Sequence, residues 1–249
     1  MRSLVIIVGM GEVGRPLHTV LSKTYECVGV DVERVNIDAA CSVLHICYPY
    51  QIKGFVRTTV SYIETFRPKL TIINSTVPPG TTRAVYEASK AQIAYSPIRG
   101  KHVRMEQELL RYRKFVAGID PASTIEARQH FEAAGLATDE FRSPEIGELS
   151  KLLETTWLGV LIGWAQEIQR FAATYDASYR EVNAFVEEID FLPSHIFPGV
   201  IGGHCVMPNI ELLREVFDSQ FLNAVVVSNE LREQSEPNVD RERICRELV

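Results

Sequence analysis

The chain has few of the features that identify disulfide-rich, zinc-binding or membrane proteins. Its 249 residues include five cysteines, and no two of them form a CxxC pair. A disulfide framework or a zinc ribbon is therefore not expected, and a reducing cytoplasm is the predicted compartment. No apolar run approaches the roughly 20 residues that cross a bilayer, and the run Leu4–Val8 is too short for a signal peptide. We expect no association with membranes.

Positive charge is also scarce. The sequence has 26 Lys and Arg residues against 32 Asp and Glu residues, which gives a formal net charge of −6. This balance disfavours nucleic acid as a partner. His195 and His204 lie nine residues apart across an expected loop, and we expect no metal site there. The composition, 46% hydrophobic and 23% charged, is that of a globular protein with one large domain or two smaller ones.

Apolar periodicity divides the chain near residue 143. Before this point, continuously apolar segments alternate with segments of helical spacing, which predicts an α/β fold with a Rossmann-like, doubly wound parallel sheet. Strands are expected at Ser3–Val8, Tyr25–Val30, Val43–Cys47, Leu70–Ile73, Ile93–Tyr95, Phe115–Ile119 and Leu136–Phe141. Helices are expected at Val13–Lys23, Gln51–Phe66, Thr81–Ser89 and Pro121–Ala134.

Beyond Ser143-Pro144 the pattern is helical. Helices are expected at Pro144–Tyr175, Tyr179–Ile189 and Glu211–Gln234, with a Pro/Gly-rich loop from Phe191 to Pro208. We therefore predict a dinucleotide-binding domain in residues 1–143 and a smaller all-helical domain in residues 144–249.

A glycine-rich turn follows the first expected strand. Residues 9–14 read G-M-G-E-V-G, the G-x-G-x-x-G pattern that lets a backbone approach a pyrophosphate at a helix N-terminus. Asp31 ends the second strand, where a carboxylate accepts both ribose hydroxyls and favours NAD over NADP. A plain tight turn and an S-adenosylmethionine site are the alternatives. The residues assigned to the cofactor here are Gly9, Gly11, Glu12, Val13, Gly14, Asp31, Tyr48 and Pro49.

Three further segments, with the glycine-rich turn, occur in an order that resembles the UDP-glucose/GDP-mannose dehydrogenase family. Asn74–Thr82 (N-S-T-V-P-P-G-T-T) resembles the S-T-V-x-P-G-T-T loop that lies beside the nicotinamide in that family. Glu148–Lys151 resembles the start of its helix with Lys and Asn at i and i+4. Pro198–Cys205 resembles its P-G-x-x-G-G-H-C loop. The resemblance extends from the N-terminus to about residue 230.

This resemblance implies an activity. Members of the family oxidise the primary alcohol of a nucleotide sugar to a carboxylate with two NAD, through a thioester that water hydrolyses. It implies that Cys205 is the nucleophile, that Lys151 stabilises the oxyanion, and that Thr76 positions water or the substrate oxygen. It also assigns Ser75 and Thr76 to the cofactor. Gly203 and His204, in the cysteine loop, are assigned to the substrate.

Three places depart from the family's pattern. Thr155 replaces its Asn four residues after Lys151, and Asn209 replaces its Asp four residues after Cys205. We keep both among the catalytic positions, although Asn209 cannot ionise and activation of water is weakened. The segment 96–102 is basic where the family supplies a carboxylate.

The basic segment has two interpretations. Arg99, Lys101 and His102 are assigned to substrate binding as an anion site, because Arg suits bidentate binding of carboxylate or phosphate. The alternative is a solvated basic loop. We expect the third, nucleotide-sugar-binding domain of the family to be absent.

Two other functions remain open. A sheet domain followed by a helical domain with a helix lysine also fits a single-step hydroxyacid-type dehydrogenase. A dinucleotide-binding protein without redox turnover is the third possibility, and fold cannot decide among them. We also expect a homodimer formed through the long helix, on which Trp157 and Trp164 lie seven residues apart.

Overall fold

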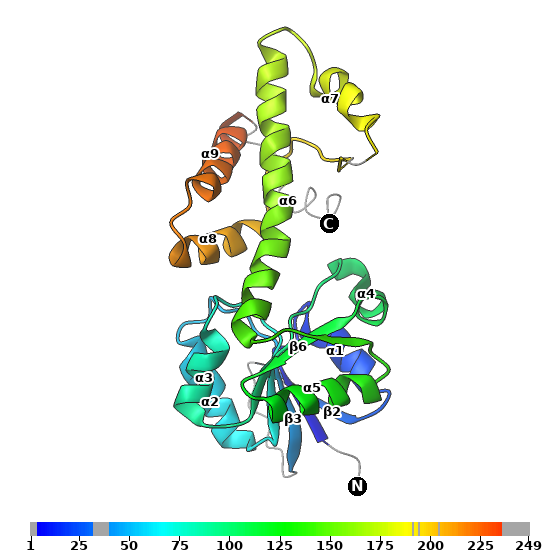
Figure 1. Ribbon diagram of the computed structural model, residues 1–249, viewed down its shortest axis with the longest axis vertical. Helices are drawn as coiled ribbons and strands as arrows, with labels where there is room; N and C mark the ends of the chain where they lie inside the picture. Colours follow the sequence, from blue (N-terminus) through cyan, green and yellow to red (C-terminus); the bar gives the residue numbers. More distant parts are fainter. Residues whose placement is uncertain (1–3, 32–39, 191, 194, 204, 236–249) are drawn as a thin grey trace. The chain divides into compact units, whose positions relative to one another are not determined.

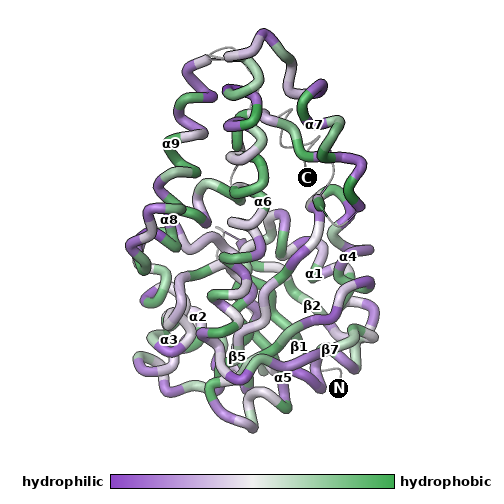
Figure 2. The backbone as a smooth tube through the Cα atoms, turned by 45° about the horizontal axis from the view of Figure 1, so that its top comes forward, coloured by the Kyte–Doolittle hydropathy of each residue, from purple (hydrophilic) through white to green (hydrophobic). Residues whose placement is uncertain are grey.

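Continuously apolar segments build the sheet of the N-terminal part (Figure 1). The structure, a computed structural model, describes residues 4–31, 40–190, 192–193, 195–203 and 205–235. Leu4–Val8 is apolar and buried at every position, as a strand covered on both faces must be. Figure 2 colours the central strands as hydrophobic. The strands are β1 (Leu4–Val8), β2 (Glu26–Val30), β3 (Cys41–Ile46), β4 (Leu70–Ile73), β5 (Ile93–Tyr95), β6 (Lys114–Gly118) and β7 (Thr138–Glu140).

The described strands form one sheet in the order β2-β1-β3-β4-β5-β6-β7. Neighbours are parallel from β2 to β5 and again between β6 and β7. The sheet is mostly parallel, as expected, and one pair departs from this, because β6 runs antiparallel to β5. The connection between them holds the short 3-10 helix η1 (His102–Arg104) and helix α4 (Met105–Arg111), and the chain enters β6 from the end of the sheet at which β5 finishes.

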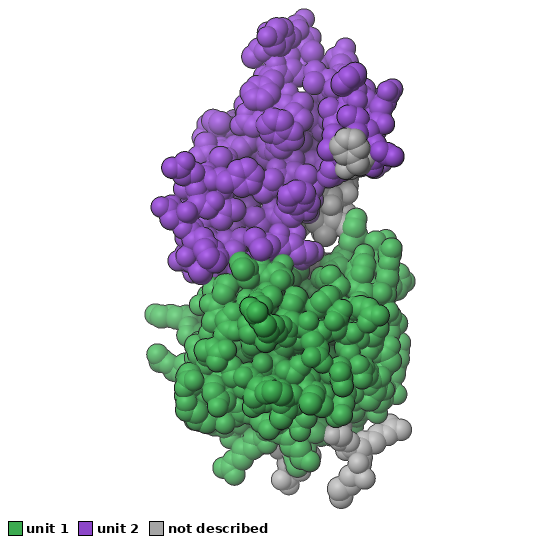
Figure 3. All heavy atoms as spheres, in the orientation of Figure 1, with its two compact units in different colours: residues 1–151 green, residues 152–249 purple. Residues whose placement is uncertain are grey.

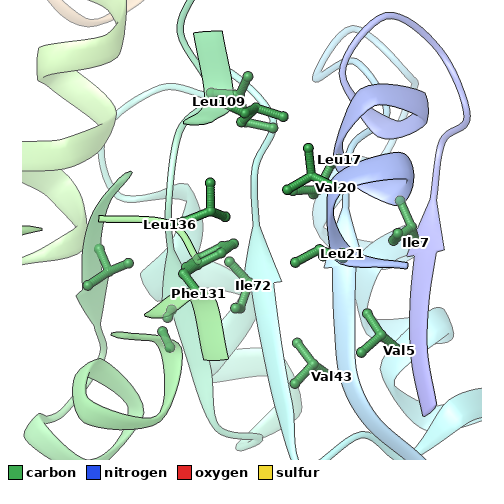
Figure 4. Close-up of a cluster of buried hydrophobic side chains, with 14 of the residues drawn as sticks. Val5, Ile7, Leu17, Val20, Leu21, Val43, Ile72, Leu109, Phe131 and Leu136 are labelled. Carbon is green, nitrogen blue, oxygen red and sulfur yellow. The ribbon is translucent and has the colours of Figure 1, made fainter. Parts of the chain in front are cut away.

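Helices cover both faces of the sheet. Helices α1 (Gly14–Leu21), α4 and α5 (Pro121–Ala133) pack on one face, and α2 (Phe55–Phe66) and α3 (Thr81–Ser89) pack on the other. Figure 4 shows the first of these layers, where Leu17 and Phe131 lie among side chains of the sheet. The expected Rossmann-like, doubly wound fold is confirmed.

The C-terminal part contains only helices among its described elements. These are α6 (Pro144–Ala173), α7 (Tyr179–Glu187), α8 (Val206–Val216) and α9 (Gln220–Ser235). The chain divides into two compact units, residues 1–151 and residues 152–249 (Figure 3). The division lies inside α6, whereas the expected boundary at residue 143 is where α6 begins. The core of the second unit contains Ile162, Ile201, Val206, Ile210 and Val225.

Three helical segments differ from the sequence-based expectation. Helix α4 was not predicted, because it is short and offers little apolar periodicity. Helix α8 begins at Val206, inside the loop expected to reach Pro208; a proline in the first turn is tolerated since the N–H there has no intrahelical partner. The single helix expected at Glu211–Gln234 is α8 followed by α9, because Phe217 adopts an extended backbone.

Among the residues that the structure describes, no helix combines the length and apolar character needed to cross a membrane. The same residues hold no group of three or more His, Cys, Asp or Glu side chains arranged to bind a metal ion.

A buried chain of hydrogen bonds connects β3, the residues just after β4 and β5, β6 and α5 within the first unit. His45 Nδ1 lies 2.8 Å from Asn74 Oδ1, and Asn74 Nδ2 donates to the Ser96 carbonyl at 2.5 Å. Because Oδ1 only accepts, Nδ1 of His45 carries the hydrogen. His45 Nε2 then accepts from His130 Nε2 at 3.0 Å. Lys114 Nζ donates to the same Ser96 carbonyl at 2.8 Å, so the chain ends beside β6.

Burial keeps this pair of histidines neutral. Desolvation lowers the pKa of His130 to about 4 and holds the pKa of His45 well below its ordinary value, with the neighbouring His130 as the second cause for His45. The pKa of such a histidine is lower in the folded state than in the unfolded state, where it is near 6.5. Its contribution to stability is fully present above pH 6.5 and decreases as the pH falls toward the folded-state pKa.

We expect the free energy of unfolding to decrease as the pH falls from 7 to 5. The pKa shift of His130 alone corresponds to about 2 kcal/mol over this range. Urea unfolding followed by circular dichroism at both pH values measures it. His130→Gln should reduce this pH dependence. Equal pH dependence in the unmodified protein and His130→Gln would contradict the assignment.

Candidate functional site

Four strands end side by side at one edge of the sheet. The last residues of β2, β1, β3 and β4 are paired in register: Val30 with Val8, Val8 with Ile46, and Ile46 with Ile73. The chain runs from β1 to β2 on one side and then crosses to β3 on the other side of β1. Such a switch point is where open α/β sheets bind ligands, outside the carboxyl ends of the strands.

The residues assigned to the cofactor follow directly from this register. Gly9 follows β1, Asp31 follows β2, Tyr48 comes two residues after β3, and Ser75 comes two residues after β4. Backbone hydrogen bonds continue the alignment past the strands, since Gly9 N donates to the Val30 carbonyl at 2.8 Å. Asp31 is exposed, as a residue that meets a ribose must be.

The three glycines of the turn have three different surroundings. Gly9 has φ +93, and a Cβ there would lie 2.6 Å from Tyr48 N. A Cβ at Gly14 would lie 1.9 Å from the Gly9 carbonyl oxygen, so helix and turn could not pack as they do. A Cβ at Gly11 would meet no described atom within 4 Å. The fold itself therefore requires Gly9 and Gly14, whereas Gly11 leaves open space beside the backbone.

The start of α1 suits an anion. Val13 is its N-cap residue, and the described chain supplies neither a side-chain cap nor an acidic residue in the first turn. The first N–H groups of a helix have no intrahelical acceptor, and they lie at the positive end of the helix dipole. Together with the open space at Gly11, this arrangement fits the pyrophosphate of a dinucleotide. Glu12, just before the helix, is exposed.

Hydrogen bonds join the segment after β4 to the end of β3 and the segment after it. The Ser75 hydroxyl lies 2.6 Å from the Tyr48 carbonyl oxygen and 3.2 Å from that of Ile46. The side chain of Ser75 thus joins the two loops. Thr76 is half-buried and Pro49 is exposed, so both remain accessible at this edge.

The basic segment begins just after β5. Arg99 is exposed, and its guanidinium lies 5.5 Å from the ring centre of Tyr112 and 5.1 Å from that of Phe115. One guanidinium nitrogen donates to the Arg113 carbonyl at 3.2 Å. Lys101 is exposed, and the side chain of His102 lies outside the described residues. Arg99 is therefore held in place while its charge faces solvent, which is compatible with an anion site.

The second unit brings two of the expected catalytic positions into contact. Asn209 Nδ2 donates to Thr155 Oγ1 at 2.9 Å, and Thr155 Oγ1 donates to the Leu152 carbonyl at 3.1 Å. Asn209 is buried. The two residues that depart from the family's pattern are therefore one hydrogen-bonded pair, and neither can ionise near neutral pH.

Cys205 is the N-cap residue of α8 and is half-buried. A helix N-terminus lowers the pKa of a thiol, because the dipole and the first N–H groups stabilise the thiolate. Sequence reasoning missed this feature, since it placed the start of the helix at Glu211. Gly203, with φ +76, is exposed, and His204 lies outside the described residues.

Buried polar side chains of α6 and α9 hold the loop before Cys205. Asn229 Oδ1 accepts from Ile201 N at 2.7 Å, and Asn229 Nδ2 donates to the Ile201 carbonyl at 3.3 Å. Gln166 Nε2 donates to the Gly199 carbonyl at 2.7 Å. Sequence reasoning missed both residues. The only signal is a polar residue within otherwise apolar helical spacing, and that signal does not identify a partner.

The remaining assigned residues are divided between the units. Thr76 and Lys151 belong to the first unit, and Lys151 is half-buried at its end. Cys205, Thr155 and Asn209 belong to the second unit. Each unit thus contributes part of the set that the motifs assign to catalysis.

Comparison with known proteins identifies a family for part of the chain. The model of the central domain of the UDP-glucose/GDP-mannose dehydrogenase family matches residues 145–232. The UDP-N-acetyl-D-mannosamine dehydrogenase of Methanocaldococcus jannaschii is 23% identical over 258 residues, covering 81% of this chain and 59% of that enzyme. The chain therefore spans little more than half the length of this relative. The resemblance inferred from the motifs is confirmed.

Solved structures share the fold. The UDP-D-ManNAc dehydrogenase of Pyrococcus horikoshii matches with a TM-score of 0.79 at 18% identity, over 93% of this chain and 68% of that chain. The 3-hydroxyisobutyrate dehydrogenase of Mycobacterium tuberculosis, solved with L-serine, matches with a TM-score of 0.71 at 13% identity. That match covers 100% of this chain and 99% of the other. At such identities the likeness concerns the fold alone.

Proposed function

We propose that the chain is an NAD-dependent dehydrogenase acting on a sugar-type alcohol. Residues 145–232 match the central domain of the UDP-glucose/GDP-mannose dehydrogenase family, and the preceding unit has a sheet edge of the dinucleotide-binding type. Nucleotide sugars are the proposed substrates. The observation that carries the proposal is the glycine-rich turn, where Gly11 faces open space at the start of α1, an uncapped helix. The M. jannaschii relative is named for UDP-N-acetyl-D-mannosamine, which is the first substrate to test.

The proposed cofactor site lies along the aligned strand ends. Backbone N–H groups around Gly11 and Gly14 bind the pyrophosphate, and Asp31 accepts hydrogen bonds from the adenine-side ribose. Pro49, Thr76 and the backbone of Tyr48 line the further part of the edge. The ring of Tyr48 is buried, and its hydroxyl lies 2.6 Å from that of Thr59. NAD, when bound there, supplies the hydride acceptor. An S-adenosyl cofactor is less suitable, because it has no pyrophosphate for the N-terminus of α1 to bind.

The proposed chemistry follows the roles that the motifs assign. Cys205 attacks the aldehyde carbon of the oxidised sugar, and its position at the start of α8 favours the thiolate. Lys151 stabilises the developing oxyanion. Loss of a second hydride, which a second NAD would accept, turns the thiohemiacetal on Cys205 into a thioester. Thr76 positions the water that hydrolyses this thioester and releases the carboxylate and the Cys205 thiol. Arg99 and Lys101, with His102, Gly203 and His204, bind the anionic substrate.

Release of the product is the slow step of this proposal. The side chains of Thr155 and Asn209 form a hydrogen bond with each other at 2.9 Å, and neither is a carboxylate that could take a proton from water. General acid–base assistance is typically worth about 10²–10⁴-fold in rate. A single-step hydroxyacid dehydrogenase needs no hydrolysis and is the second candidate, favoured by this same pair. A dinucleotide-binding protein without turnover is the third.

The organisation of the protein is part of the proposal. Residues 1–143 form the dinucleotide-binding domain, residues 144–249 the helical domain, and the cytoplasm is the proposed location. We also propose a homodimer. Trp157, Trp164 and Phe171 recur every seven residues on α6 and are 60%, 59% and 55% exposed. An apolar stripe of this kind pairs with itself across a two-fold axis.

The preference for NAD should depend on Asp31. We expect calorimetry to give a lower dissociation constant for NAD than for NADP, because the Asp31 carboxylate repels a 2′-phosphate. Asp31→Ala should reduce the ratio of the NADP dissociation constant to the NAD dissociation constant about tenfold, or ~1.4 kcal/mol. Glu126→Ala, which removes an exposed carboxylate from α5, should leave the ratio unchanged. Equal constants in the unmodified protein would contradict the role of Asp31.

Cys205 should be the most reactive thiol. Burial raises the pKa of Cys27, that of Cys41 to about 11 and that of Cys47 to about 12, so these three are poor nucleophiles. We expect iodoacetamide to label Cys205 first, as measured by peptide mapping. During turnover, intact-protein mass spectrometry should show a sugar adduct that Cys205→Ser abolishes and Cys27→Ser retains. Labelling of Cys245 while Cys205 stays unmodified would remove the basis of the covalent mechanism.

The oligomeric state tests whether the apolar stripe of Trp157, Trp164 and Phe171 on α6 forms a dimer interface. Light scattering should give a mass about twice the 28.1 kDa of the chain. Trp164→Glu should produce the monomer, because a charge in an apolar seam is costly to bury. Phe221→Glu, at an exposed apolar position on α9, should leave the dimer intact. A 28.1 kDa species in the unmodified protein would exclude the homodimer.

A further inference from the structure

Glu148 caps a helix that belongs to another part of the first unit. The residue lies near the start of α6 and is fully buried. Its two carboxylate oxygens accept hydrogen bonds from Gly80 N at 2.6 Å and from Thr82 N at 2.7 Å. These amides are the N-cap and the second N–H of α3, which begins at Thr81. One side chain thus satisfies two backbone groups of a distant segment.

Helix α3 has no local substitute for this cap. Its N-cap residue is Gly80, with φ +95 and no side chain to accept a hydrogen bond. The adjacent Thr81 hydroxyl donates backward to the Pro78 carbonyl at 2.7 Å. Buried N–H groups need an acceptor, and the positive end of a helix favours an anion. Glu148 meets both requirements for Gly80 and Thr82.

The capped amides close the loop that carries Thr76. Ser75 fixes the beginning of this loop through its bond to the Tyr48 carbonyl, and Glu148 fixes its end at Gly80 and Thr82. Residues 76–79 lie between these two attachments. Release of either attachment would free the backbone on one side of Thr76.

Glu148 also lies on the helix that carries Lys151. Residues at i and i+3 share one face of a helix, so Glu148 places the face of α6 that bears Lys151 against the end of the loop that bears Thr76. We propose that Glu148 is a positioning residue that sets the backbone of residues 75–82 and links it to the first turns of α6. The part of this inference that concerns catalysis rests on the proposed function, because that function assigns roles to Thr76 and Lys151.

The test compares two carboxylates on the same helix. Glu148→Gln keeps the shape but turns an NH₂ group toward one of the two N–H donors, so one hydrogen bond is lost and a buried donor loses its acceptor. Glu145→Gln is the matched control. Glu145 lies one turn earlier and bonds the exposed side chain of Arg83 on α3 at 2.6 Å, without touching the loop backbone.

Hydrogen exchange followed by mass spectrometry measures how often the backbone N–H groups of the loop open to solvent, and it does not require catalytic turnover. In Glu148→Gln we expect exchange in peptides covering residues 75–82 to accelerate about tenfold to a hundredfold, as loss of a charged hydrogen bond implies. Exchange in β1 and α5 should stay unchanged, and Glu145→Gln should match the unmodified protein throughout. If Glu148→Gln does not fold, Glu148→Asp, which retains the charge on a shorter side chain, should show the same local acceleration.

Kinetics separate positioning from a purely structural role. With NAD and a nucleotide sugar, Glu148→Gln should lower kcat about tenfold and leave the KM of the sugar unchanged, because Arg99 and Lys101 are not affected. Unchanged exchange in residues 75–82, or acceleration spread over the whole first unit, would overturn the inference. So would normal kcat with a freed loop. An unmodified protein without turnover would instead refute the proposed function and leave the exchange result to decide the role of Glu148.

Discussion

The register of four parallel strand ends is the constraint on which the rest of the first unit depends. Since Val30, Val8, Ile46 and Ile73 are paired in one line, the residue after each of them emerges at the same level of the sheet. A shift of a single residue in one strand would turn its buried side chains to the other face and move its loop out of line. Burial of apolar strands on both faces thus specifies the position of the proposed cofactor edge.

Buried polar side chains then hold the loops that this edge and the second unit present. Glu148 binds the backbone before α3, and Asn229 binds the backbone of Ile201 before α8. In both cases a helix distant in sequence supplies the hydrogen-bond partners that a buried loop needs. The proposed catalytic residues Thr76 and Cys205 follow from motifs, whereas Glu148 and Asn229, which bind the backbone near each of them, lie elsewhere in the sequence.

The sequence is informative where structure is local. Apolar runs predict β1, β3 and β4 to within two residues, and the spacing of Gly9, Gly11 and Gly14 predicts the turn and the start of α1. The sequence does not predict hydrogen bonds between residues that lie far apart along the chain. The hydrogen bond between His45 and His130 joins residues 85 positions apart, and that between Thr155 and Asn209 spans 54. The reversed direction of β6 has no signal in the sequence either, because the connection before it is about as long as the connections between the parallel strands.

The central claim is that the chain oxidises a nucleotide sugar through a cysteine-linked intermediate. The most direct measurement is the number of NADH molecules formed for each molecule of UDP-N-acetyl-D-mannosamine consumed, with absorbance for NADH and mass spectrometry for the sugar product. The account predicts two NADH per uronic acid, with Cys205→Ser unable to form the acid. One NADH per substrate with a product that is not a carboxylate would contradict it, as would NAD binding without any NADH formed.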